Sequence, residues 1–159
     1  GTVGAAMEAA SQGIPAIAAS LQLRDDSLVY SYSEEIDFST AAYFTAYFAR
    51  QILEKHLPQD VDMLKIDVPY DATPQTDWRI TRLGRHRYYM PQSEREGEWS
   101  EPGRIGFKRA TIQPGDAPTD TDVHVINIDK KVSVTPLSLD ITSRVRFDDF
   151  DHFLRGTKK

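Results

Sequence analysis

The chemistry that this sequence could support starts at its first two residues, Gly1 and Thr2, which open a run of small residues. The start of a helix presents unpaired backbone N–H groups and a partial positive charge, and both attract an anion. Glycine would let a phosphate approach the backbone, and threonine would add a hydroxyl donor. The alternative is that Thr2 is only the N-cap of a helix. Residue types alone favour the cap, and both interpretations stay open at this point.

Two acidic clusters offer the oxygen ligands that hard cations prefer. Asp120 and Asp122 lie in the stretch TDTD, and Asp148, Asp149 and Asp151 lie near the end of the chain. Loops and terminal arms carry such clusters routinely, for solubility or capping. We therefore favour a structural role for both clusters over metal binding.

The histidines lie at positions 56, 86, 124 and 152, and no two have the spacing of metal ligands on a helix. His86 belongs to the basic run RLGRHR, from Arg82 to Arg87. We interpret this run as a solvent- or interface-facing ribbon; the alternative is a cationic wall near a phosphate substrate. The sequence has no G-x-S-x-G elbow, no P-loop and no G-x-G-x-x-G turn after a strand, which argues against a generic dinucleotide binder.

Composition narrows the function classes further. The 159 residues, 40% hydrophobic and 27% charged, suffice for one ordinary domain. A net charge of -5 argues against a nucleic-acid polymer as partner. The absence of cysteine excludes disulfides, thiolate metal sites and thiol catalysis. No apolar run reaches the roughly 20 residues of a membrane span, so we expect a cytoplasmic protein without a membrane partner.

The elements that must position these groups begin with a helix over residues 2–12, which Gly13 would stop. Residues 14–20, IPAIAAS, predict a short strand buried on both faces of a parallel sheet. A second, longer helix is predicted over 38–57, and LKIDVP at 64–69 predicts another core strand. The apolar face of the longer helix would comprise Phe38, Ala41, Thr45, Phe48, Ile52 and Leu53.

Beyond residue 70 the sequence alternates in the manner of strands. Residues 77–90 and 104–113 are rich in β-branched and aromatic residues, and the polar segment 91–103 predicts a long turn. We expect an extended hairpin that packs on a partner subunit, because an isolated two-stranded ribbon is marginal in water. Residues 27–33 are either a strand or an extended loop, and VHVINI at 123–128 predicts a short strand.

The chain closes with an apolar run over residues 131–142 and a tail of mixed character. The tail predicts a short helix or arm with Phe147, Phe150 and Phe153 at three-residue spacing. We interpret these aromatic residues as a docking surface.

Four stretches resemble the SurE family of survival proteins: GTVGAAMEAASQGIPAIAAS, LKIDVP, ITRLGRHRY and DTDVHVINIDKKVSVTPLSLDIT, in this order. The family usually shows a GTVGAAMEG-type helix, a GIPAIAVS-type strand and a VSVTPLSLDLT-type closing segment. The resemblance covers most of the chain, and Ala9 stands where the family often has glycine. It implies an α/β fold, a Rossmann-like core that is incomplete here, with a projecting β-hairpin and a C-terminal arm. The family pattern includes a TDTD-like stretch, which favours a loop-shaping role for Asp120 and Asp122.

The resemblance also implies a metal-dependent phosphomonoesterase that hydrolyses nucleoside 5′- and 3′-monophosphates, with polyphosphate as a further substrate. In the family pattern an Asp-Asp pair, a Ser and an Asn hold a divalent ion, Mg or Mn. All four lie upstream of residue 1, so we assign no metal ligand and no catalytic residue in this chain. Gly1 and Thr2 match the end of the family's Ser-Gly-Thr turn, which faces the phosphate. We therefore predict that Gly1 and Thr2 bind the phosphate of the substrate.

Family members assemble as dimers or tetramers through the hairpin and an exchanged C-terminal segment, so we expect a homo-oligomer. Residues 1–70 would be the downstream part of the core, 71–122 the hairpin and loop for oligomerisation, and 123–159 the closing strands and exchanged arm. The alternative function is a non-catalytic oligomerisation fragment of the same fold. Alone, the chain is expected to be inactive and poorly folded, because a sheet without its first strands exposes an edge.

Overall fold

The computed structural model describes residues 1–24, 34–87, 89–93, 97–98, 100, 102–103 and 105–156. The predicted segment 27–33 lies outside the described residues. The elements are α1 (Thr2–Ser11), β1 (Ala16–Leu21), α2 (Ser39–Lys55), β2 (Met63–Val68), β3 (Trp78–Ile80), β4 (Tyr89–Ser93), β5 (Ile105–Arg109), α3 (Asp122–His124), the π-helix η2 (Val125–Asp129), β6 (Val132–Leu137) and α4 (Phe147–Arg155). No helix within these ranges combines the length and apolarity that a membrane span requires.

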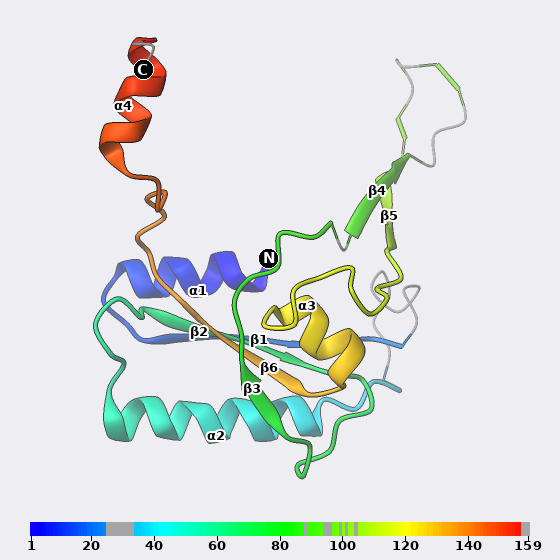
Figure 1. Cartoon of the computed structure of the whole chain (residues 1–159). Coiled ribbons are helices and arrows are strands. Elements are labelled where there is room, and N and C mark those ends of the chain that lie inside the picture. Colours follow the sequence, from blue (N-terminus) through cyan, green and yellow to red (C-terminus); the bar gives the residue numbers. More distant parts are fainter. Residues whose placement is uncertain are drawn as a thin grey trace.

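A four-stranded sheet with the order β1-β2-β6-β3 forms the centre of the molecule (Figure 1). β1 and β2 are parallel, β6 runs antiparallel to β2, and β3 runs parallel to β6. Figure 1 shows α1 on one face of the sheet and α2 on the other. The predicted α/β fold is confirmed, with a sheet of mixed direction.

The first helix begins at Thr2, and the N-cap is Gly1, with no side-chain capping hydrogen bond. The interpretation of Thr2 as the N-cap is therefore wrong. The predicted stop at Gly13 is confirmed, because this residue has φ of 76°. The Gly13 N–H donates to the Ala10 carbonyl (2.9 Å) and the Ile14 N–H to the Ala9 carbonyl (3.3 Å), which is a Schellman motif.

The buried face of α2 differs in part from the predicted one. Phe38 and Leu53 are 56% and 77% exposed. Phe38 precedes the first helical residue and lies outside the buried stripe. The side chains that pack on the sheet follow the i, i+3, i+4 spacing of a helix face: Ala41, Phe44, Phe48 and Ile52.

Alternating residues of the sheet face the two helices. The α2 side is apolar throughout: Ile66, Val68, Val132 and Val134 pack against Phe44 and Phe48. The α1 side is apolar only in part, where Ala16, Ala18 and Met63 meet Ala6 and Ala10 of the helix. Farther along the strands, the residues on the α1 side are polar: Ser20, Lys65, Asp67, Ser133 and Thr135.

The predicted strand over residues 77–90 is wrong, because the structure divides that segment. Its first part is β3, which joins the main sheet beside β6. The hairpin instead consists of β4 and β5, which pair antiparallel from Tyr89–Arg109 to Ser93–Ile105, so β4 extends into the predicted turn. Figure 1 shows this ribbon projecting from the sheet.

The predicted strand at 123–128 is also wrong, because this segment is helical in α3 and η2. The Thr121 side chain accepts a hydrogen bond from the His124 N–H and caps the helical turn. Neither side of β6 is free for another strand, because β2 and β3 occupy both. As a helical segment, the stretch still buries Val125 completely.

Candidate functional site

A cavity of about 370 Å³ lies at the carboxyl ends of the parallel strands β1 and β2, and we name it the polar cavity. Ligands of open α/β sheets bind at this edge. Its polar and charged lining residues include Ser20, Lys65, Asp67, His86, Asp122 and Asn127.

Strand register brings these side chains together on one face. Ser20 of β1 lies beside Asp67 of β2, which in turn lies beside Ser133 of β6. Two residues before Asp67 in β2, Lys65 lies between Ala18 of β1 and Thr135 of β6. Neighbours across a sheet share a face, so the polar residues form a continuous patch.

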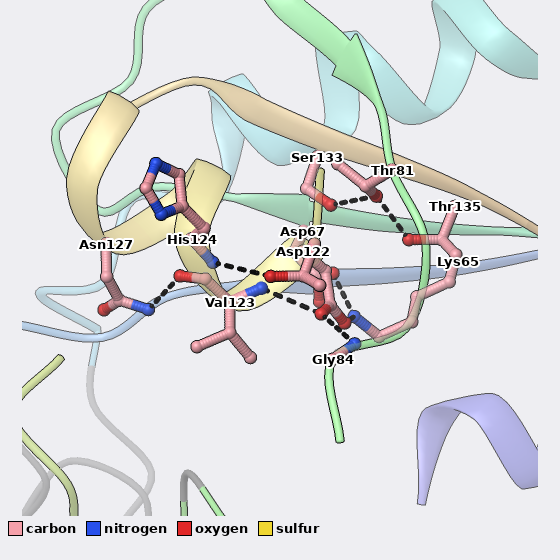
Figure 2. A network of polar contacts seen from close by, with 11 residues as sticks. Lys65, Asp67, Thr81, Gly84, Asp122, Val123, His124, Asn127, Ser133 and Thr135 are labelled. Atoms are coloured by element: carbon pink, nitrogen blue, oxygen red, sulfur yellow. Dashed lines mark hydrogen bonds and ion pairs between the residues drawn. The ribbon is translucent and has the colours of Figure 1, made fainter. Parts of the chain in front are cut away.

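Lys65 lies between two carboxylates, as Figure 2 shows. Its ammonium donates to the Asp67 carboxylate and to Oδ2 of Asp122, at 3.0 Å from the latter. The side chains of Lys65, Asp67 and Asp122 are 18%, 14% and 10% exposed. One ammonium thus faces two carboxylates in a largely buried setting.

Burial and the neighbouring charges shift the pKa values of Lys65 and Asp67. Burial alone would lower the pKa of Lys65, but the two carboxylates outweigh it and raise that pKa. Burial raises the pKa of Asp67, and the Asp122 charge raises it further, while Lys65 compensates only in part. The pKa of Asp67 is therefore raised by burial and by the Asp122 charge although Lys65 binds its carboxylate.

The other oxygen of Asp122, Oδ1, holds the cavity wall in place. It accepts hydrogen bonds from the backbone N–H groups of Gly84 and Val123, both at 2.8 Å. A Cβ atom added to Gly84 would lie 3.1 Å from Oδ1 itself, so a side chain at this position would press on the carboxylate. The predicted loop-shaping role of Asp122 is confirmed, and Asp120 forms an exposed ion pair with Arg82 at 2.6 Å.

A second polar layer supports the cluster. The Thr81 hydroxyl lies 2.8 Å from that of Ser133 and 2.7 Å from that of Thr135, and all three side chains are buried. Of the basic run from Arg82 to Arg87, the structure brings Gly84 and His86 to the polar cavity. Arg82, Arg85, His86 and Arg87 are exposed, as the favoured solvent-facing interpretation expects, and the alternative of a cationic wall near a phosphate substrate stays a prediction.

Gly1 and Thr2 are exposed and do not line the polar cavity. Helix α1 runs back against β1, so its first turn lies at the same edge of the sheet as the carboxyl ends of β1 and β2 (Figure 1). The first intrahelical bond joins the Ala5 N–H to the Gly1 carbonyl (3.2 Å). The N–H groups of Thr2 to Gly4 have no acceptor within the helix, which is the arrangement that suits an anion.

Sequence reasoning missed Lys65 and Asp67. The available signal was the presence of two charged residues at i and i+2 in an otherwise apolar core strand, LKIDVP. Spacing of two places both on one face of a strand. Buried charges need partners, and such a pair indicates a polar site.

Among the described residues, no group of three or more histidine, aspartate or glutamate side chains could hold a metal ion. Asp67 and Asp122 are close together, but the Lys65 ammonium binds both. In the tail, Asp151 pairs with Arg155 at 2.8 Å. These side chains do not fit a divalent cation.

Comparison with known proteins shows the family to which the chain belongs. The family model for "Survival protein SurE" matches residues 1–90. A 5′-nucleotidase SurE from Thermococcus kodakarensis is 43% identical over 94% of this chain, and one from Thermococcus gammatolerans is 40% identical over 98%. The chain belongs to the SurE family. It spans 56% and 57% of the length of these two relatives.

A solved structure agrees with the SurE fold. The crystal structure of a SurE protein from Aquifex aeolicus superposes with a TM-score of 0.66 and 25% sequence identity. The match covers 97% of this chain and 57% of that one. The chain therefore has the fold of the corresponding part of a SurE protein.

Proposed function

We propose that the SurE protein containing this chain is a phosphomonoesterase that hydrolyses nucleoside 5′-monophosphates. The observation that carries the proposal is the shared position of two features at one edge of the sheet, the open first turn of α1 and the polar cavity. Relatives that cover nearly all of this chain are named 5′-nucleotidases. We extend the proposal to 3′-monophosphates and polyphosphate on the family resemblance.

In this proposal the phosphate binds at the start of α1. The N–H groups of Thr2, Val3 and Gly4 donate to its oxygens, and Gly1 lets it approach the backbone, because glycine has no side chain. Thr2 is exposed at the first helical position, and its hydroxyl supplies a further donor. These donors stabilise the negative charge on the phosphoryl oxygens during its transfer to water. The polar cavity supplies groups for the sugar and base.

Divalent-metal dependence is part of the family expectation, with ligands that precede Gly1 in the family pattern. The described side chains do not form such a site, so no role in metal binding is assigned to them. Chelation of the full-length protein followed by addition of Mg²⁺ or Mn²⁺ tests this expectation. Activity unchanged by chelation would contradict it. The cytoplasmic location likewise stays a prediction.

The hydroxyl of Thr2 provides the test of the phosphate site. In full-length protein, Thr2→Val should lower kcat/KM for AMP by about tenfold, the worth of one hydrogen bond to a charged group. Thr2→Ser is the matched control, because it retains the hydroxyl and should stay near the wild-type value. Equal kcat/KM for Thr2→Val and wild type would refute the phosphate-binding role of Thr2. Absence of phosphate release from any nucleotide would refute the proposed phosphomonoesterase activity.

We also propose that the protein assembles as a homodimer or homotetramer through the β4–β5 ribbon and α4. In support, α4 leaves Phe147, Phe153 and Leu154 exposed at 71%, 76% and 67%. Such exposed apolar side chains on one short helix are typical of a surface that a partner covers. Deletion of residues 147–159 should reduce the oligomer mass in light scattering. An unchanged mass would argue against the role of α4.

A further inference from the structure

A second cavity, which we name the basic cavity, lies beside the polar cavity and differs from it in charge. Its volume is about 400 Å³, and its charged lining residues are Arg24, Arg109 and Lys130. In the described part of the chain, no aspartate or glutamate lines it. The polar cavity, in contrast, contains two carboxylates that share one lysine.

Two of the three cations are held at the cavity wall by specific contacts. Arg109, the last residue of β5, donates to the Leu23 carbonyl (2.9 Å) and to the Arg24 carbonyl (3.3 Å). The Arg24 guanidinium lies over the ring of Tyr70, 5.2 Å from its centre, in a cation–π contact. These contacts join the base of the ribbon to the segment after β1 and pre-position positive charge.

The third cation, Lys130, ends the π-helix η2 in a left-handed conformation with φ of 54°. Arg24 and Lys130 are both exposed, and neither forms an ion pair with another residue that the structure describes. Asp25 and Asp26 follow Arg24 in the sequence and lie outside the described residues. Concentrated positive charge in a concave site attracts anions.

We propose that the basic cavity binds a phosphate-bearing anion. Guanidinium groups suit phosphate oxygens because they donate paired hydrogen bonds, and a lysine adds a compact charge. The side chains of Gln22 and Asn127 line both cavities, and Gln22 Nε2 donates to Asn127 Oδ1 at 3.3 Å. The bound anion therefore lies one side-chain layer from the polar cavity. It is a free phosphate, a nucleotide phosphate or one unit of a polyphosphate chain.

Calorimetric titration of the full-length protein tests the proposal with three probes. These are inorganic phosphate, tripolyphosphate and a nucleoside monophosphate analogue with a carbon in place of its ester oxygen, which cannot be hydrolysed. Arg24→Gln and Lys130→Asn each remove one cation, and asparagine tolerates the left-handed backbone of residue 130. Each variant should weaken binding of the cognate probe about three- to tenfold, and the probe that responds identifies the source.

Lys108→Gln is the matched control. It removes the same charge from the neighbouring position of β5, and adjacent strand residues point to opposite sides. The affinity of Lys108→Gln for each probe should equal that of wild type. The proposal is overturned if Arg24→Gln and Lys130→Asn each bind all three probes with the same affinity as wild type. The readout is binding, so this result is distinct from a loss of nucleotide hydrolysis, which concerns the proposed function.

Discussion

Replacement of Lys65 by methionine should destabilise the protein strongly, because it leaves two carboxylates buried without their cation. Methionine has a similar length and keeps the packing of the aliphatic stem. The Lys65, Asp67 and Asp122 side chains are only 18%, 14% and 10% exposed, so water compensates little. Removal of one partner from a buried ion pair typically costs about 3 to 5 kcal/mol.

The contacts of the two carboxylates narrow the expected loss of stability. Asp122 keeps the N–H donors of Gly84 and Val123, each at 2.8 Å, so its charge stays partly compensated. Asp67 can instead take up a proton. Protonation of Asp67 at pH 7 costs about 4 kcal/mol, because pH 7 is about 3 units above the ordinary pKa of an aspartate and each unit costs about 1.4 kcal/mol. We therefore expect a loss of about 3 to 4 kcal/mol for Lys65→Met at pH 7.

The pH dependence gives a second, independent number. Lys65 lowers the pKa of Asp67, so its removal raises that pKa further in the folded state. A carboxyl group with a higher pKa in the folded state destabilises that state more as the pH rises, so the variant loses stability more steeply than wild type. Acidification should therefore reduce the penalty of Lys65→Met, to about 1.5 kcal/mol at pH 5. The double variant Lys65→Met/Asp67→Asn should recover more than half of the loss at pH 7, because it removes the uncompensated charge.

Equilibrium urea unfolding of full-length protein, followed by circular dichroism, measures these free energies. Lys131→Met is the matched control, because Lys131 pairs with Asp77 at 2.7 Å in an exposed setting. Its cost should be below about 0.5 kcal/mol. Equal losses in the free energy of unfolding for Lys65→Met and Lys131→Met would show that Lys65 does not compensate two buried carboxylates. A Lys65→Met penalty that does not fall on acidification would show the same.

Three further outcomes follow from single contacts. Gly84→Ala should cost about 1 to 2 kcal/mol in urea unfolding, because the new methyl group presses on the Asp122 carboxylate at 3.1 Å; no loss would show that the wall yields freely. Thr121→Val should cost about 1 kcal/mol in the same measurement, because it removes the cap of the helical turn, and an unchanged stability would argue against that cap. The pKa of Asp77 should lie below its ordinary value in carboxyl-carbon NMR titrations, because Lys131 and the Trp78 N–H bind its charged form, and Lys131→Gln should raise it.

Much of the fold could be predicted from local sequence. The helix of small residues, its stop at Gly13 and the strand LKIDVP each depend on neighbours within a few residues, and all three are present. The segment 123–128 shows the limit. Its alternating pattern favours a strand, but the Thr121 side chain caps a helical turn at this point.

The candidate site divides in the same way. Gly1 and Thr2 are adjacent residues at a helix start, so local reasoning places them at an anion-binding turn, and their role in phosphate binding stays a prediction. Arg24, Arg109 and Lys130 come from three separate segments of the chain. Local sequence patterns do not show which separate segments lie side by side in the fold, so the basic cavity could not be predicted from them.

The sequence by itself determined the α/β class, the SurE family and the open first turn of α1, because each resides in contiguous residues. Only the tertiary structure decided that Lys65 lies between Asp67 and Asp122. Asp122 is 57 residues away from Lys65 along the chain, and the backbone N–H groups of Gly84 and Val123 hold its second oxygen. The charge balance of the site thus depends on strand register and loop closure, which no local pattern encodes.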